Sequence, residues 1–446
     1  MRNLISCLFI ILLSCPVFLL AEDAPAAGPS MYDLPRCLNE ALQNNHDLRQ
    51  ARERIEREHG VTLMAQGAML PQLGLSSYYQ DTDKGLLPEQ TRDSIDNNKD
   101  WSASAEVRQP LFAGGKLVAG YRQQSLHQEA AQHEYDAAQN TVMSTVKQRF
   151  YAVLLARSRV IVQEEMLKLL EEELRSEESK RDAGVVSDFN VLRAEVELAN
   201  NRAPHIKAQN EARITLDELG QVLGLTGPAL QSTTARLDIA GELSFEPFAV
   251  KLEDALTSAY EKRPELKQLE LRQQAARQGI KIAQAGYLPA IDLVGGYDVR
   301  KSGYSDRLGD ELHGWKAGVQ GQWTVFDSFQ TAGDVSRARS EEALARTQLE
   351  QARVNVEVEV RRAWSSLIEA NELVRASQKV VEQARESLRL ARSRFDAGVA
   401  TQLEVLDTQV ALTDARNNEV QALYQYNVAR ASLEQAMGEK GLPKSN

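Results

Sequence analysis

Cysteine is scarce in this sequence. Its 446 residues include only Cys7, Cys15 and Cys37, and the first two lie in an apolar stretch at the N-terminus. Once that stretch is removed, Cys37 has no second thiol to pair with, so no internal disulfide is possible. Small domains that depend on a disulfide framework are therefore excluded, and packing has to stabilise the fold.

Aromatic residues and catalytic motifs are also few. Phe, Trp and Tyr make up 6% of the chain, whereas Ala, Gln, Glu, Arg and Leu are abundant. This composition favours long helices over a thick globular core. The histidines form no HExxH motif, and the spacing of His127 and His133 does not place them on one helix face as a metal pair. No glycine-rich phosphate loop is present. We therefore expect no enzyme activity, no cofactor and no bound metal.

The chain carries an excess of acidic residues. Asp and Glu number 63 against 52 Lys and Arg, which gives a formal net charge of −11. Nucleic acid is excluded as an expected partner, because its phosphates are bound by clustered basic residues. The acidic balance is compatible with a polar conduit that attracts cations.

An apolar run, Leu4–Leu20, follows Arg2 and leads into Ala21. The pattern predicts a secretory signal peptide over residues 1–21, cleaved after Ala21. Two alternatives stay open. A membrane anchor is disfavoured because the run is short and is broken by Pro16. A lipoprotein signal is possible because Leu12-Leu13-Ser14-Cys15 fits a lipid-attachment box, although lipidation at Cys15 would leave an apolar stretch on the mature chain.

The second half of the chain repeats the first. Trp101–Gly224 aligns without a gap with Trp315–Gly438, 214 positions later, and Asp47–Pro71 aligns with Glu265–Pro289 at an offset of 218. A long tandem repeat is one supersecondary unit used twice. We therefore expect a first structural repeat at 22–224, a connector with a short strand at 225–250, a second repeat at 251–438 and a tail at 439–446.

Each repeat contains one very long helix. Neither Pro nor Gly occurs between Gly120 and Arg181 or within Val335–Asp396. Apolar residues recur there every three or four positions, which predicts coiled-coil helices of about 60–70 residues, or roughly 100 Å. Both helices stop at a glycine, Gly184 or Gly398, which fits the left-handed conformation that ends many helices.

A return helix follows each of these glycines. Ser187 and Thr401 are the expected N-caps, and the return helices run to Gly224 and Gly438. Each repeat therefore has a long helical hairpin, at 113–224 and at 328–438. Pro204 predicts a kink or break in the first return helix. One shorter helix is expected to open each repeat, over Leu34–Met69 and Lys251–Tyr287.

Between the opening helix and the long helix, apolar residues alternate with polar ones, as in Trp101–Val107 and Trp315–Trp323. This predicts two β-hairpins, at about 72–112 and 289–326, with the length and alternation of transmembrane strands. A half-buried sheet in a soluble domain would alternate in the same way. Four strands cannot close a barrel, and an open edge cannot lie in lipid. A membrane-spanning sheet would therefore need several chains, and three would supply twelve strands.

Taken together, these features resemble the TolC family of outer-membrane efflux and secretion ducts. The matching residues are Leu70-Pro71-Gln72-Leu73-Gly74-Leu75, Leu111-Phe112-Ala113-Gly114-Gly115, and the hairpin tips at Gly184 and Gly398. The resemblance implies a mainly α fold with a small transmembrane β part. A homotrimer would form a twelve-stranded β-barrel in the bacterial outer membrane, continued by a periplasmic α-helical barrel. It also implies a passive exit duct for efflux or type I secretion, joined to an inner-membrane transporter through a periplasmic adaptor protein.

The resemblance also points to two sites. Two acidic residues narrow the periplasmic entrance of family ducts, and they match Glu404 and Asp407, which are one turn apart on one helix face. Three chains would gather six carboxylates around one axis and bind cations there. The hairpin tips would contact the adaptor, through Gly184, Val185, Gly398, Val399 and Leu403.

The sequence departs from the family pattern at the entrance. A family duct is held shut by a basic residue and a Tyr that pair with an Asp, and the matching positions here are Ala400, Phe395 and Asn190. That ion pair cannot form in this chain. The second copy of the Gly-Gly signature also lacks glycine, because it reads Phe326-Asp327-Ser328-Phe329.

Two other functions stay open. An envelope-spanning coiled-coil scaffold without a pore would have the same long helices, but the alternating strands disfavour it. A periplasmic adaptor also has a signal peptide and a helical hairpin, but adaptors usually have a single hairpin and no tandem repeat. The sequence does not indicate which substrate a duct would carry.

Overall fold

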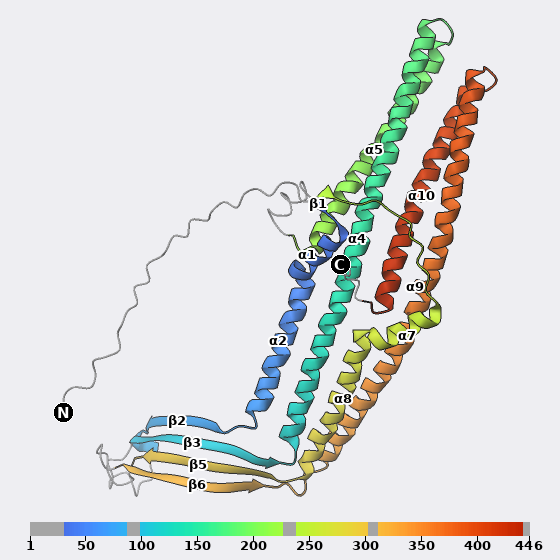
Figure 1. Cartoon of the computed structure of the whole chain (residues 1–446). Helices are drawn as coiled ribbons and strands as arrows, with labels where there is room; N and C mark the ends of the chain where they lie inside the picture. The colour runs from blue at the N-terminus through green and yellow to red at the C-terminus, as the bar shows by residue number, and fades with distance from the viewer. Residues whose placement is uncertain (1–30, 87–98, 226–237, 302–310, 440–446) are drawn as a thin grey trace.

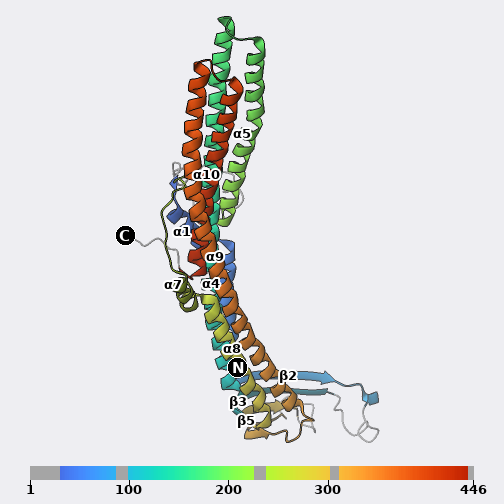
Figure 2. The same ribbon diagram turned by 90° about the vertical axis from the view of Figure 1, so that its right-hand side faces the viewer.

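The computed structural model describes residues 31–86, 99–225, 238–301 and 311–439. The predicted signal peptide, with Cys15 and Ala21, lies outside these residues, as do 226–237 of the connector and 440–446 of the tail. The described chain is an elongated body of helices with a small β-sheet at one end (Figure 1). Turned by 90°, the body is slender, and the sheet again projects sideways from the foot of the helices (Figure 2).

Two very long helices run through the body, as predicted. Helices α4 (Lys116–Asp182) and α9 (Gln330–Asp396) each have 67 residues, which corresponds to roughly 100 Å at ~1.5 Å per residue. They pair with the return helices α5 (Asp188–Val222) and α10 (Gln402–Ala436), each 35 residues long. Helix α5 continues through Pro204 without a break. Among the described helices, none is both long and apolar enough to cross a membrane.

The opening helix of each repeat is divided in two, so the prediction of a single helix was wrong. The first repeat opens with α1 (Leu34–Asn44) and α2 (His46–Gly67), and the second with α7 (Leu252–Lys262), α8 (Pro264–Gln284) and the short 3-10 helix η2 (Ala285–Tyr287). The first break is at Asn45, whose extended backbone and side-chain oxygen cap α2. The second is at Arg263, because the residue before a proline is driven out of the helical region.

The sheet has four antiparallel strands in the order β2 (Gln72–Asp81), β3 (Lys99–Ala113), β5 (Ala290–Arg300) and β6 (Leu312–Gln322). A 3-10 turn, η1 (Lys84–Leu86), follows β2. The central ladder, β3 with β5, joins the two repeats. In this protomer β2 and β6 are edges, each paired on one side only. Elsewhere, β1 (Met31–Tyr32) pairs with β4 (Asp238–Ile239) of the connector.

The turn from the sheet into each long helix has the same backbone in both repeats. Gly114 and Gly115 have φ of 61° and 83°, and Ser328 and Phe329 have φ of 55° and 67°. Left-handed backbone is unfavourable for residues with a Cβ, so the glycine-free copy is strained. The Asp327 carboxylate holds it by accepting a 2.7 Å hydrogen bond from the Thr331 amide.

The two largest apolar clusters of the described chain belong to different repeats. One apolar cluster joins α1, α4, α5 and the connector, and another joins α7, α9, α10 and the connector. The connector is fixed to the second cluster by side chains that reach its backbone. The Tyr426 hydroxyl donates to the Glu246 carbonyl at 2.6 Å, and the Trp364 indole donates to the Val250 carbonyl at 2.9 Å.

Cys37 lies in the first cluster with no exposed surface. Burial raises the pKa of its thiol to about 12, so roughly one thiol in 10⁵ is ionised at pH 7, and the thiolate is the reactive form. We expect Cys37 to resist maleimide in the folded protein and to react fully in denaturant, as counted by mass spectrometry. The exposed-tip variant Val185→Cys controls for reagent activity. Equally fast labelling of folded wild type would show that α1 does not cover the thiol.

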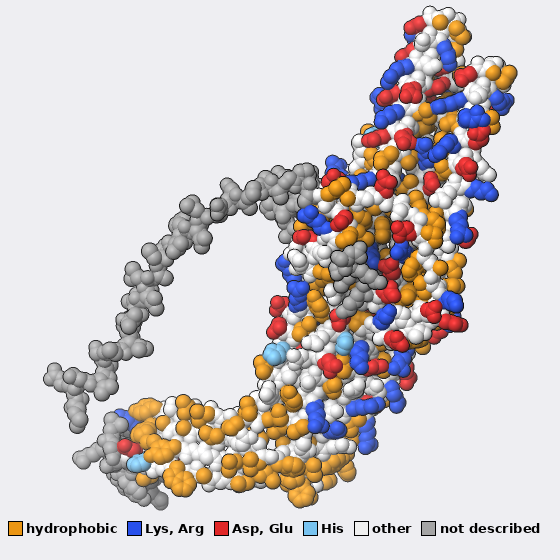
Figure 3. Space-filling view, in the orientation of Figure 1, with side chains coloured by type: hydrophobic (Ala, Val, Ile, Leu, Met, Phe, Trp, Pro, Cys, Tyr) orange, Lys and Arg blue, Asp and Glu red, His pale blue; other side chains and the backbone are white. Residues whose placement is uncertain are grey.

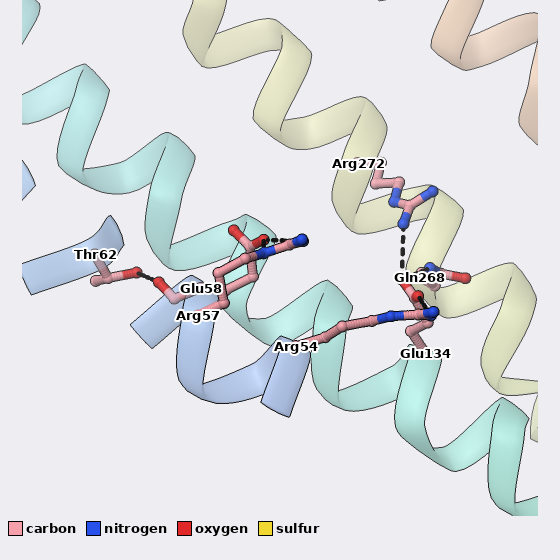
Figure 4. A network of polar contacts seen from close by, with 7 residues as sticks. All are labelled: Arg54, Arg57, Glu58, Thr62, Glu134, Gln268 and Arg272. Atoms are coloured by element: carbon pink, nitrogen blue, oxygen red, sulfur yellow. Dashed lines mark hydrogen bonds and ion pairs between the residues drawn. The ribbon is translucent and has the colours of Figure 1, made fainter. Parts of the chain in front are cut away.

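The two repeats meet along α4, and Glu134 marks the polar part of this contact (Figure 4). Its carboxylate accepts from Arg54 of α2 at 2.9 Å, and from Gln268 and Arg272 of α8 at 2.8 and 2.9 Å. This half-buried carboxylate of α4 thus binds α2 of the same repeat and α8 of the second repeat.

Candidate functional site

Both hairpin tips have the same backbone geometry. At the first tip, Gly184 has φ of 75°, its amide donates to the Arg181 carbonyl, and the Val185 amide donates to the Lys180 carbonyl, each at 2.8 Å. This pair of bonds closes the end of α4 as a Schellman motif. At the second tip, Gly398 has φ of 72°, and the equivalent two bonds are both 2.9 Å long. Glycine is required at both positions by the left-handed backbone.

The tips present apolar side chains to the surroundings. Val185 is 72% exposed, Val399 65% and Leu403 47%. Phe189, at the start of α5, is 68% exposed and was missed by the sequence reasoning. The repeat offset could have found it, since Phe189 is the counterpart of Leu403. The exposed apolar surface is therefore larger than the five residues that the sequence indicated.

Glu404 is part of the cap of α10. The Thr401 hydroxyl accepts from the Glu404 amide, and a Glu404 carboxylate oxygen accepts from the Thr401 amide, both at 3.4 Å, forming a capping box. The other carboxylate oxygen lies 3.3 Å from a guanidinium nitrogen of Arg394 on α9. Thr401 is therefore an N-cap as expected. Ser187 has the N-cap position of α5, but its side chain makes no capping bond.

Asp407 lies one turn further along α10 and is exposed. Within the part of the chain that the structure describes, no hydrogen bond or ion pair to its carboxylate is found. Of the two acidic residues, Glu404 therefore has a structural role in the cap of α10, whereas Asp407 is exposed to solvent.

The residues at the positions of the family's closing pair make a different contact. Lys180 of α4 places its ammonium 4.8 Å from the ring centre of Phe395 on α9. Behind it, the fully buried Glu177 carboxylate lies 2.8 Å from the same ammonium and 3.5 Å from the Asn190 amide nitrogen. Asn190 and Phe395 are thus brought into one group, which links the tips of the two hairpins. Ala400 makes no part of it.

The sheet has one apolar and one polar face. Trp101 of β3 and Trp315 of β6 lie on the apolar face, where they are joined by aliphatic residues of the strands. The space-filling view shows a surface of the sheet with little charge (Figure 3). The other face carries ion pairs between strands. Arg108 of β3 binds Asp292 of β5 at 2.5 Å. Lys316 of β6 binds both Asp298 of β5 at 3.4 Å and Glu106 of β3 at 3.1 Å.

Lys316 reaches Glu106 across Gly296. These three residues share one row of the sheet, with Gly296 between the other two. A Cβ on Gly296 would lie 3.2 Å from Cε of Lys316 and 2.8 Å from the Ala105 carbonyl oxygen. The missing side chain is therefore what lets one lysine bind carboxylates on two neighbouring strands.

No group of metal ligands is formed by the His, Cys, Asp and Glu residues of the described chain. The chemistry that the geometry provides is a polar strand face, an acidic turn beside one tip, and exposed apolar tips.

Comparison with known proteins identifies relatives along nearly the whole chain. A family model described as Outer membrane efflux protein matches residues 37–225 and 255–439. Outer membrane protein TolC of Salmonella enteritidis is 24% identical over 417 residues, covering 91% of this chain and 82% of the relative. The pyoverdine export outer membrane protein OpmQ of Pseudomonas aeruginosa is 25% identical over 418 residues, covering 91% and 85%.

Solved structures share the fold. The open state of the MtrE outer membrane channel of Neisseria gonorrhoeae superposes with a TM-score of 0.74 at 20% identity, covering 92% of this chain and 89% of that one. The tandem arrangement of long helical hairpins and short strands is therefore a known architecture.

Proposed function

Because this chain belongs to the outer membrane efflux protein family and is an outer-membrane efflux channel, we propose that three copies form the exit duct of a tripartite efflux or type I secretion system. The observation that carries this proposal is the four-stranded sheet with two open edges. Unpaired backbone groups are not tolerated in lipid. Three sheets joined edge to edge would close a twelve-stranded barrel, with the ion-paired face inward and the apolar face toward lipid.

The duct itself is passive, and two partners would complete the system. The sequence has no phosphate-binding loop, so energy would come from an inner-membrane transporter. A periplasmic adaptor would bind the exposed apolar tips, at Gly184, Val185, Gly398, Val399 and Leu403, with Phe189 as an addition. Charged residues are usually depleted at the centre of such interfaces, which fits these side chains.

Glu404 and Asp407 would form the acidic ring of the periplasmic entrance. Three copies of this turn of α10 around one axis would concentrate negative charge in a narrow passage and attract cations. Since Glu404 is engaged with Thr401 and Arg394, we assign most of the ion selectivity to Asp407.

The contact of Lys180 with Phe395 would hold the entrance closed. It joins the first hairpin to the second at the tips, and a cation–π contact contributes about 0.5–2 kcal/mol. Glu177 positions the ammonium from behind. This contact would replace the ion pair that Ala400, Phe395 and Asn190 cannot make.

Single-channel recording in a planar lipid bilayer tests the proposed duct. We expect discrete cation-selective steps from the wild-type protein, and a loss of most cation preference in Glu404→Gln/Asp407→Asn. Glutamine at position 404 keeps the capping box, so the helix end is preserved. Unchanged cation selectivity in the double variant would show that Glu404 and Asp407 do not form the acidic ring of the entrance.

A closed entrance would limit the wild type to rare or small openings, and Lys180→Met distinguishes that state from a scaffold without a pore. The variant keeps the length of the side chain and removes its charge, so we expect more frequent or larger openings. Silence of both proteins after confirmed insertion would contradict the duct.

A further inference from the structure

A groove runs between α9 and α10, near the end of α10 that is remote from the hairpin tip. Its volume is about 560 Å³, which is in the range of sites that hold small molecules. Buried alanines of both helices line it: Ala363, Ala370 and Ala429. The groove opens away from the connector. Its residues Arg362 and Ser366 are each two positions from Trp364, whose indole binds the connector backbone, so they lie on the other side of the helix.

The same place in the first hairpin is crossed by two ion pairs. Arg149 of α4 binds Glu218 of α5 at 2.6 Å. Further along the same two helices, Arg159 binds Glu211 at 3.0 Å. Long charged side chains therefore bridge α4 and α5 at two levels.

The second hairpin lacks both bridges. At the repeat offset of 214 positions, the counterparts of the first ion pair are Ala363 and Ser432, and those of the second are Leu373 and Gln425. All four residues line the groove. None of them is charged, so the space that the ion pairs cross in the first hairpin stays open in the second.

The groove has two charges of its own. Arg362 and Glu369 of α9 line it and are exposed, and they stand at the positions of the neutral Gln148 and Leu155 of α4. A spacing of seven residues places them on one helix face, about 10 Å apart along the axis. Within the part of the chain that the structure describes, neither side chain forms an ion pair or a hydrogen bond.

The rest of the groove suits an uncharged, flat body. Its third charged residue, Glu359, is already paired with the Arg263 guanidinium at 2.7 Å. Tyr424 and Val428 of α10 line the groove opposite α9, and a tyrosine ring can pack against another aromatic ring. A few polar groups around an apolar groove fix the orientation of a ligand.

We propose that the groove between α9 and α10 binds a small amphoteric aromatic compound, with an acidic group at one end and a basic group at the other. The acid would bind the Arg362 guanidinium, the base would bind the Glu369 carboxylate, and the aromatic body would lie on the alanines beside Tyr424. Charge complementarity selects this class, because a compound with one charge leaves one of the two side chains unpaired. The inference goes beyond the proposed duct, since binding requires neither conduction nor a partner protein.

Isothermal titration calorimetry of the purified full-length protein tests the site. The probe is a biphenyl with a carboxylate on one para position and an aminomethyl group on the opposite one. The matched controls are the biphenyl carboxylate and the aminomethyl biphenyl, each of which lacks one charge. We expect saturable binding of the probe at one site per chain, and about fivefold weaker binding of each control, as for the loss of an exposed ion pair.

Two sets of variants separate the space of the groove from its charges. Ala363→Arg/Ser432→Glu rebuilds the ion pair that the first hairpin has at this level, and we expect it to abolish binding. Arg362→Gln and Glu369→Gln should each weaken binding about fivefold. The exchange variant Arg362→Glu/Glu369→Arg keeps both charges in reversed order, so the probe can turn round and should bind as it does to the wild type.

Circular dichroism shows whether each variant keeps its helices. No saturable binding to the wild type, or equal binding by the folded variant with the rebuilt ion pair, would overturn the site. If either singly charged control binds as tightly as the probe, the groove does not select amphoteric compounds and the proposed class is wrong. Binding that is as weak in the exchange variant as in Glu369→Gln would show that the two side chains do not act through their charges.

Discussion

Gly296→Val is expected to prevent the strands from assembling in the membrane. A Cβ at this position would be 2.8 Å from the Ala105 carbonyl oxygen and 3.2 Å from Lys316 Cε, and real Cβ atoms are not found so close to backbone oxygen. Overpacking of this kind costs about 1–3 kcal/mol per site. The substitution would also push Lys316 away from Glu106, leaving carboxylates of two strands without their shared cation. In the proposed trimer, the damage would occur three times in one barrel.

The measurement is the amount of folded channel in the outer-membrane fraction, judged by heat-dependent mobility on gels. Gly295→Val is the matched control, because it adds the same side chain one residue earlier. Its Cβ would first meet the Lys316 carbonyl oxygen at 3.9 Å, an ordinary contact, and it would point to the opposite, apolar face. We expect near-normal assembly of Gly295→Val. Normal assembly of Gly296→Val would show that the register of β3, β5 and β6 is wrong.

Charge at the hairpin tips is expected to abolish adaptor binding and export while leaving the pore intact. Val185, Phe189, Val399 and Leu403 are exposed by 72%, 68%, 65% and 47%. If they are buried against an adaptor, aspartate at these positions would place unpaired charges in an apolar interface, which costs several kcal/mol. The glycines are left unchanged, so both Schellman motifs persist.

The readouts are adaptor capture by the purified channel and single-channel conductance. The variant with four aspartates should lose capture and keep its conductance. Val185→Thr/Val399→Thr keeps the shape of both side chains and adds only hydroxyls, so it should bind nearly as well as the wild type. Full binding by the aspartate variant would locate the adaptor contact elsewhere on the helices.

The broad architecture could be predicted from the sequence because it depends on long, repeated patterns. A run without Pro or Gly from Gly120 to Arg181 has few alternatives to a helix, and the second copy supplied an independent test of the same pattern. The local boundaries were harder. Pro264 is a sequence signal for the helix break at Arg263. The prediction missed this signal because the apolar periodicity continues on both sides of it. Asn45 has a side chain that can cap a helix, but asparagine also occurs within helices. Only the extended backbone in the structure shows that Asn45 caps α2.

Some contacts of the candidate sites could also be predicted from local sequence, and others could not. The capping box of Thr401 and Glu404 has a sequence signature, and it gives Glu404 a structural role that family resemblance alone did not indicate. By contrast, the contact of Lys180 with Phe395 depends on how two hairpins, more than 200 residues apart in sequence, lie against each other. No local pattern encodes that distance. The residue types of Ser328 and Phe329 disfavour a left-handed backbone, and only their alignment with Gly114 and Gly115 in the first repeat points to it.

The strand order has a consequence for the timing of biogenesis. The central ladder pairs residues 102–113 with 290–300, so it cannot form until nearly two-thirds of the chain has been exported. Contacts between such distant segments form slowly, because a long loop has to close first. Even then β2 and β6 lack partners on their outer sides, and a bilayer would reject those unpaired edges. In the proposed trimer, insertion would therefore wait until the edge strands of three subunits have paired.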